Sequence, residues 1–304
     1  MKFASEEIKT AFAQYCTKAT QNIAPLADKP EESSDATCAA LWLAAAGISA
    51  SAVTALDMEI PILTSQQQAV LETLFDERIA GKPLSHLTRR QHFMNIEMLA
   101  DPAALIPRKE TELVAALGLK SIAEALKKKP AIRVIDVCTG SGNLACTFAR
   151  SFPSIQVFAA DLSEEAVAFA KSNSIFIGVA GNTEFRSGDL LSPFDSPEFI
   201  NSTDVLTCNP PYISSKKLEE MPNEIKSFEP EMAFNGGAFG IAILGKLAKD
   251  AVRFLVPGGY LCVEIGLGQG SGIIKMFERT EFFTLVETLA DHSGNIRAIR
   301  MRKI

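Results

Sequence analysis

The chain has 304 residues, of which 47% are hydrophobic, and it carries a formal net charge of -6. This length and apolar content suffice for two folded domains with a sizeable core, which argues against a disordered protein. The negative charge argues against general attraction to a nucleic-acid backbone, because proteins that bind one usually present a basic face.

The six cysteines show no CxxC spacing and lie in largely apolar segments, as is typical of reduced, buried thiols. We therefore expect no zinc or other metal site. No run approaches the roughly 18 apolar residues of a membrane span, and the first residues lack the apolar core of a signal peptide. These features predict a cytoplasmic protein that makes no membrane contact.

The first 85 residues are rich in Ala, Leu, Glu and Gln. Apolar residues recur at three- and four-residue intervals in three stretches, at 5–18, 35–47 and 64–80. Ser34 or Asp35 is a suitable cap for the second stretch. The pattern predicts a small helical domain over residues 1–85.

Short extended pieces follow between residues 86 and 107. Those at 91–94 and 96–99 can pair as a hairpin. We interpret 86–107 as a connector between the helical domain and the rest of the chain.

From residue 108 onward, helical and extended patterns alternate. Helices are expected at 110–128, 143–151, 163–174 and 240–255, and strands at 132–138, 155–160, 183–186, 204–208 and 259–265. Such alternation predicts an α/β domain with a mostly parallel sheet covered on both faces. The last segments, 283–289 and 295–302, are expected to complete this sheet as an antiparallel pair.

The first strand of the predicted sheet leads into a glycine-bearing loop. The strand contains Asp136, and the loop Cys138-Thr139-Gly140-Ser141-Gly142 follows it. Glycines allow close approach of the backbone to a ligand, and the helix beginning near Asn143 directs free N–H groups to the same place. Asp136 and the five loop residues are therefore candidate contacts for a small polar molecule.

Acidic residues also end the next two strands. Asp161 is placed where a carboxylate can accept hydrogen bonds from both hydroxyls of a ribose. Asp189 could bind an adenine amino group, with Leu162 and Leu190 on either side of the ring. The glycine loop lacks the third glycine of the dinucleotide fingerprint and a Walker-type lysine, so S-adenosylmethionine fits better than NAD or ATP.

The motif Asn209-Pro210-Pro211-Tyr212 directly follows the fourth strand. An amide nitrogen is a weak nucleophile, so a catalyst must hold it facing the electrophilic methyl group. The side-chain oxygen of Asn209 and the carbonyl of Pro210 can each accept one N–H of an uncharged planar group. The prolines stiffen the loop, and Tyr212 offers a flat stacking face. We predict that Asn209, Pro210 and Tyr212 are catalytic, that the whole motif binds substrate and that Asn209 also contacts the cofactor.

With other segments, this motif resembles a known family. Asn-Pro-Pro-Tyr after the fourth strand is shared by DNA and RNA amino-methyltransferases and by protein glutamine N5-methyltransferases. Residues 105–112 resemble the IPRPETE segment of the release-factor glutamine methyltransferases of the PrmC/HemK type. Segment 78–83 resembles the one that precedes the family's hairpin, and 229–237, 257–266 and 291–294 follow in that family's order. The resemblance covers roughly residues 35–304.

The resemblance implies a Rossmann-like, seven-stranded class I S-adenosylmethionine-dependent methyltransferase domain at 108–304, preceded by a helical substrate-recognition domain and a β-hairpin connector. It implies methyl transfer to the glutamine in the Gly-Gly-Gln motif of class I peptide chain release factors, without a metal. By position, residues 138–142 would contact the methionine part of the cofactor, Asp161 the ribose, and Asp189 with Leu190 the adenine. Residues 209–212 would hold the glutamine, and the helical domain would grip the release factor.

Several residues depart from the family pattern. Cys138 replaces the first glycine of Gly-x-Gly-x-Gly, as in the related ribosomal protein L3 glutamine methyltransferases. Lys109 replaces a proline, His86 replaces a tyrosine, and the glycine expected near Arg89 is absent. The last three changes lie in the segment expected to face the substrate, so they bear on the acceptor more than on the reaction.

The acceptor therefore has alternatives. A ribosomal protein glutamine, a free amino acid or another small metabolite could take the methyl group on the same fold. A nucleic-acid adenine N6-methyltransferase is disfavoured by the negative charge. A binding module without catalysis is disfavoured by the intact Asp161, Asp189 and Asn209. We assign no general base, because the amide proton becomes strongly acidic once the nitrogen is methylated.

Overall fold

The computed structural model describes residues 1–24, 28–214, 223–237 and 240–304. The chain divides into two compact units. The smaller comprises Met1–Pro102 and Pro222–Glu229, and the larger comprises Ala103–Met221 and Pro230–Ile304. The segment 86–107, expected as a connector, contributes its first part to the smaller unit and its end to the larger one.

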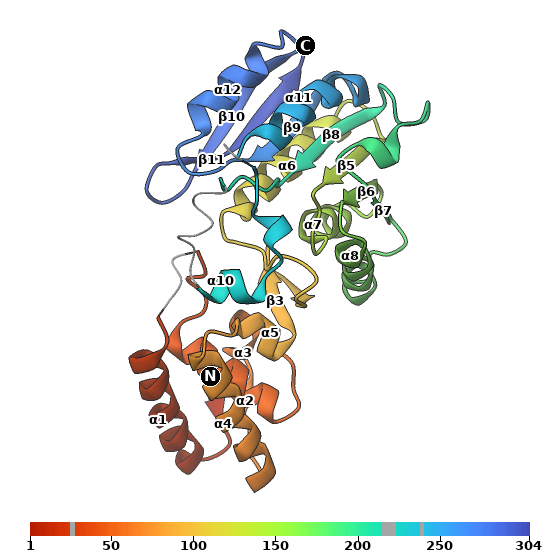
Figure 1. Cartoon of the computed structure of the whole chain (residues 1–304). Helices are drawn as coiled ribbons and strands as arrows, with labels where there is room; N and C mark the ends of the chain where they lie inside the picture. Colours follow the sequence, from red (N-terminus) through yellow and green to blue (C-terminus); the bar gives the residue numbers. More distant parts are fainter. Residues whose placement is uncertain (25–27, 215–222, 238–239) are drawn as a thin grey trace. The chain divides into compact units, whose positions relative to one another are not determined.

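The smaller unit is mainly helical (Figure 1). Its elements are β1 (Lys2–Phe3), α1 (Glu6–Asn22), α2 (Ser34–Ala45), α3 (Ala52–Ala55), β2 (Glu59–Ile60), α4 (Ser65–Ile79), α5 (Leu84–Thr88), β3 (Arg90–Phe93), β4 (Ile96–Leu99) and α10 (Asn223–Phe228). The three long helices lie where the apolar periodicity predicts them, and β3 and β4 pair as the expected antiparallel hairpin.

Side-chain caps set the starts of the long helices. Ser5, Ser33 and Thr64 each accept a hydrogen bond from a backbone N–H in the first turn of α1, α2 and α4 respectively. The cap of α2 is thus Ser33, and the expectation of Ser34 or Asp35 was wrong by one or two residues. Helix α2 is buried along almost its whole length, because its alanines allow α1 and α4 to pack closely on it.

The larger unit is built on a sheet that has seven strands in the described part of the chain. They are β5 (Arg133–Val137), β6 (Gln156–Asp161), β7 (Thr183–Ser187), β8 (Thr203–Cys208), β9 (Leu255–Glu264), β10 (Phe283–Ala290) and β11 (Ile296–Lys303). The spatial order is β10-β11-β9-β8-β5-β6-β7. Strands β9, β8, β5, β6 and β7 are parallel, and β11 is antiparallel to both of its neighbours. The predicted Rossmann-like α/β architecture is confirmed.

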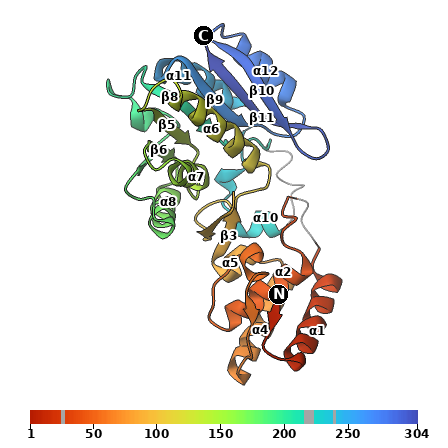
Figure 2. The same ribbon diagram turned by 180° about the vertical axis from the view of Figure 1, so that it is seen from behind.

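Helices cover both faces of this sheet (Figure 1, Figure 2). One face carries α6 (Thr111–Leu126), α7 (Asn143–Ser151) and α8 (Glu164–Ile177), and the other carries α11 (Ala242–Phe254) and α12 (Gly270–Glu278). Short 3-10 turns lie at η1 (Ser192–Phe194) and η2 (Glu231–Ala233). Helix α12 was not predicted, because its first residues, Gly-Ser-Gly, are typical of a loop.

Helix α6 lies close to the sheet and to α7, and a glycine makes this approach possible. A Cβ atom added to Gly118 would lie 2.5 Å from Cζ of Phe148 in α7. The helix packs against β8, β9 and β11. This packing places Thr111, the first residue of α6, near the end of β8, where the candidate site begins.

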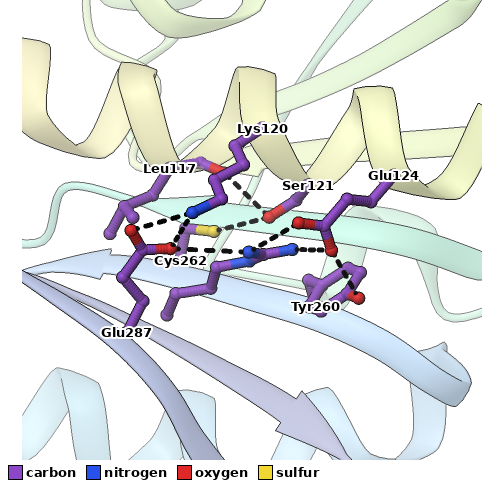
Figure 3. Close-up of polar contacts among 8 residues, drawn as sticks. Leu117, Lys120, Ser121, Glu124, Tyr260, Cys262 and Glu287 are labelled. Carbon is purple, nitrogen blue, oxygen red and sulfur yellow. Dashed lines mark hydrogen bonds and ion pairs between the residues drawn. The ribbon is translucent and has the colours of Figure 1, made fainter.

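A cluster of charged side chains around the buried Arg300 links α6 to the sheet. Glu124 and Lys120 project from α6 toward Tyr260, Cys262 and Glu287 on the strands (Figure 3). The guanidinium of Arg300, whose side chain is 1% exposed, pairs with Glu124 and lies 3.6 Å from Glu287. The hydrogen bonds from Arg300 lower the pKa of the Glu124 carboxyl from its usual 4.5 to about 2.

We expect Glu124→Gln to lower the free energy of unfolding by about 2 kcal/mol at pH 7, because a buried guanidinium loses its main partner. The effect should stay below that of a fully buried pair, since the carboxylate is a third exposed and Glu287 remains nearby. The folded-state pKa is depressed, so this stabilisation is present above pH 4.5 and is lost as the pH falls toward 2. Urea denaturation at pH 7 and pH 3 measures both effects.

The matched control is Glu278→Gln, which removes an exposed carboxylate from α12. This variant should unfold as the parent protein does at both pH values. If Glu124→Gln lost as much stability on acidification as the parent protein, the ion pair would not contribute as described.

Candidate active site

A cavity of about 280 Å³ lies in the larger unit at the carboxyl ends of the parallel strands. This edge is where open α/β sheets bind ligands. The predicted site residues that line it are Cys138, Thr139, Gly140, Ser141, Asp161, Leu162, Asp189, Leu190, Asn209 and Pro211. The rest of its wall comes mainly from residues 103–107, 143–144 and 230–235. The structure thus brings together residues from the ends of four strands.

The glycine loop forms one wall of the cavity in a backbone conformation that favours glycine. Gly140 and Gly142 have φ values of +53° and +78°, and Cys138 has +57°. A Cβ at Gly142 would also lie 3.1 Å from that of Ala170 in α8. Cys138 therefore adopts a left-handed conformation that is costly for a residue with a side chain. The hydroxyl of Ser141 is buried at this wall and has no hydrogen-bond partner among the described residues.

Asp161 joins this loop to the start of α8. Its Oδ2 accepts a hydrogen bond from the N–H of Gly140 at 2.8 Å, and its Oδ1 accepts one from the N–H of Ser163 at 3.0 Å. Burial raises the pKa of the Asp161 carboxyl, while these backbone hydrogen bonds act in the opposite direction. The carboxylate lines the cavity, and each oxygen retains a lone pair for a further hydrogen bond.

Asp136 lies behind the loop and does not line the cavity. It is fully buried and accepts hydrogen bonds from the hydroxyls of Thr139 and Thr207, both at 2.6 Å. Burial raises the pKa of its carboxyl to about 7. The side chain therefore ties the glycine loop to β8, and it can influence a ligand in the cavity through Thr139.

The far end of the cavity combines a charge pair with two leucines. Asp189 is half exposed and forms an ion pair with Lys246 of α11, a residue that the sequence analysis missed. Leu162 is exposed and Leu190 is buried, and both contribute to the wall. These residues give the cavity wall two apolar side chains and one carboxylate.

In the motif Asn209-Pro210-Pro211-Tyr212, every second residue lines the cavity. Asn209 and Pro211 line the cavity, whereas Pro210 is buried behind them. The hydroxyl of Tyr212 donates to Glu264 at 2.9 Å and accepts from Arg297 at 3.2 Å. Burial and the nearby Glu264 raise the pKa of the Tyr212 hydroxyl well above its usual value. Tyr212 is thus held in a polar network beside the cavity.

Two glycines lie in close contact with the backbone of this motif. A Cβ at Gly236 would lie 2.7 Å from the carbonyl oxygen of Pro211, and one at Gly240 would lie 2.0 Å from that of Tyr212. Larger residues at either position would displace the motif. The two glycines therefore allow the backbone of Pro211 and Tyr212 to lie where it does.

Thr111 and Glu264 also belong to this corner, and the sequence analysis gave them no role. Thr111 accepts a hydrogen bond from Nδ2 of Asn209 at 3.1 Å. Both residues occur in segments that resemble the family, 105–112 and 257–266. This resemblance was the sequence signal that could have identified them as site residues. Lys109, another departure from the family pattern, forms an ion pair with Glu112 at 2.7 Å.

The described part of the chain contains no cluster of three or more His, Cys, Asp or Glu side chains that could hold a metal ion. No helix among the same residues is both long and apolar enough to cross a membrane.

Comparisons with known proteins agree with this geometry. Residues 116–226 match the family model described as "Methyltransferase small domain". The chain is 31% identical over 81% of its length to the "Release factor glutamine methyltransferase" of Thermodesulfovibrio yellowstonii, covering 85% of that protein. The proteins of the same name from Moorella thermoacetica and Koribacter versatilis are 34% and 35% identical, over 73% and 75% of this chain and 75% and 78% of their own lengths.

Proposed function

This chain belongs to the family of the release factor glutamine methyltransferases, and we propose that it transfers a methyl group from S-adenosylmethionine to the glutamine of the Gly-Gly-Gln motif in class I peptide chain release factors. The observation that carries the proposal is the presence of Asp161 and Asn209 in one cavity. The first suits a ribose, and the second suits a carboxamide.

The residues of the cavity fit S-adenosylmethionine. The unpartnered hydroxyl of Ser141 and the close approach of backbone at Gly140 suit the polar methionine part. Asp161 can accept from the ribose hydroxyls, while Leu162 and Leu190 suit the adenine, with Asp189 at the edge. When bound, this cofactor supplies a methyl group activated by a sulfonium centre.

The contribution of the protein to the reaction is mainly orientation. Asn209 presents a neutral acceptor that can hold one N–H of the substrate amide, and the carbonyl of Pro210 is proposed to hold the other. Gripping both N–H groups orients the nitrogen toward the methyl group, and such positioning can supply a large part of the catalytic acceleration. The proton lost on methylation needs no dedicated base on this chain.

The partner in this proposal is a release factor, and we assign its docking to the smaller helical unit. The net charge of -6 agrees with a protein substrate rather than with a nucleic-acid track. A cytoplasmic location follows from the proposed partner. The same cavity suits a ribosomal protein glutamine, a free amino acid or another small metabolite with an amide, so the choice of a release factor rests on the relatives named above. An adenine base is disfavoured by the negative charge.

The test is methyl transfer from radioactive S-adenosylmethionine to a purified class I release factor. We expect labelling of the natural protein and none of a variant in which the motif reads Gly-Gly-Ala. Equal labelling of both would overturn the assignment of the acceptor. Mass spectrometry of methylated products in a cell extract would then identify the true one.

A further inference from the structure

A chain of buried polar groups stands behind the amide of Asn209. The Nδ2 atom of Asn209 donates to the hydroxyl of Thr111 at 3.1 Å. The Thr111 hydroxyl in turn hydrogen-bonds the carboxylate of Glu264. That carboxylate also accepts from the hydroxyl of Tyr212 at 2.9 Å. All four residues belong to the larger unit, and they come from α6, β9 and the loop after β8.

Glu264 determines which group donates in each hydrogen bond of this series. The hydrogen bond from Thr111 lowers the pKa of the Glu264 carboxyl, so Thr111 acts as its donor and the single proton of the Thr111 hydroxyl points at Glu264. The oxygen of Thr111 then has lone pairs, but no proton, to offer to Asn209. It can accept from the NH2 group of Asn209 and cannot donate to its oxygen.

Burial prevents water from reversing the direction of these hydrogen bonds. Thr111 and Glu264 are each 1% exposed, so water has little access to supply a substitute partner. Burial raises the pKa of the Glu264 carboxyl, while the hydrogen bonds from Thr111 and Tyr212 and the guanidinium of Arg297 act in the opposite direction. The Tyr212 hydroxyl adds a second donor to the same carboxylate, as expected for an acceptor-only group.

We propose that Thr111 and Glu264 are positioning residues that select one of the two amide orientations of Asn209, the one whose oxygen faces the cavity. This inference rests on the proposed function, because an oxygen in that position is what a substrate carboxamide needs. The opposite orientation would present an NH2 group to the NH2 group of the substrate. Two donors cannot bond, so that orientation is unproductive.

The experiment compares three variants in the methylation of a release factor. Thr111→Val removes the hydroxyl but keeps the shape, and we expect kcat to fall roughly 10- to 100-fold, as for other losses of precise positioning. Thr111→Ser restores the hydroxyl and should recover most of the activity. Ser121→Ala removes another buried hydroxyl from the same helix, away from the cavity, and should leave kcat unchanged.

Two further readouts separate positioning from structural damage. The affinity of Thr111→Val for S-adenosylmethionine, measured by calorimetry, and its thermal midpoint should match those of the parent protein. Equal kcat in the parent and Thr111→Val would overturn the inference, and so would failure of Thr111→Ser to recover activity. A parent protein that does not methylate the release factor would instead refute the proposed function.

Discussion

Replacing Asn209 with alanine should lower turnover at least about a thousandfold while leaving the affinity for S-adenosylmethionine nearly unchanged. The side chain lines the cavity, and its oxygen is the proposed acceptor for the substrate amide. Without it, the nitrogen is no longer held in line with the methyl group, so the loss falls on the chemical step. Single-turnover assays with labelled cofactor measure the rate of methyl transfer, and titration calorimetry measures the affinity for S-adenosylmethionine.

Asn201→Gly, at an exposed position of the larger unit with a φ of +50°, is a control for the loss of an asparagine outside the cavity, and it should methylate normally. Asn209→Asp is a sharper companion. It keeps the size of the side chain but cannot donate to Thr111, so it should also be nearly inactive. Normal turnover of Asn209→Ala would refute the role given to this residue.

Removing the carboxylate of Asp161 should mainly lower the affinity for the cofactor and change turnover much less. We expect Asp161→Ala to weaken cofactor binding about 100-fold, with a much smaller change in kcat at saturating cofactor. The variant loses the proposed hydrogen bonds to the ribose and the anchor of the Gly140 N–H at 2.8 Å. Hydrogen bonds to charged groups contribute about 1.5–3 kcal/mol, and the upper value corresponds to this change in affinity.

Asp195→Ala is the matched control, because Asp195 is an exposed carboxylate that pairs with Arg253 outside the cavity. Its cofactor affinity should equal that of the parent protein. If Asp161→Ala bound the cofactor normally but turned over slowly, Asp161 would act in the reaction itself, and the proposed orientation of the cofactor would be wrong.

The sheet of the larger unit follows from the sequence because its strands are short apolar runs separated by amphipathic helices. The parallel arrangement also explains why Asp161, Asp189 and Asn209 could be grouped in advance. The carboxyl ends of parallel strands meet at one edge, so residues just after them converge whatever the details of packing. All three residues line the same cavity, and the ligand contacts given to them stay predictions.

Other parts of the site depend on packing that no local pattern encodes. Thr111 reaches Asn209 because Gly118 lets α6 approach closely, and the two partners are 98 residues apart. Lys246 meets Asp189 only through the position of α11 on the sheet. Asp136 also lies near the end of a strand, but it is fully buried and bonds Thr139 instead of lining the cavity.

The smaller unit contains a helix that the chain supplies some 120 residues after the rest of it. Glu224 of α10 lies 2.9 Å from Arg78 and 3.6 Å from Lys29, and both cations are almost fully buried. A fragment that stops at residue 102 would leave Glu32 to neutralise both. Truncation of the chain at residue 102 is therefore not expected to give a stable helical unit. An isolated version of this unit would need α10 attached through a linker.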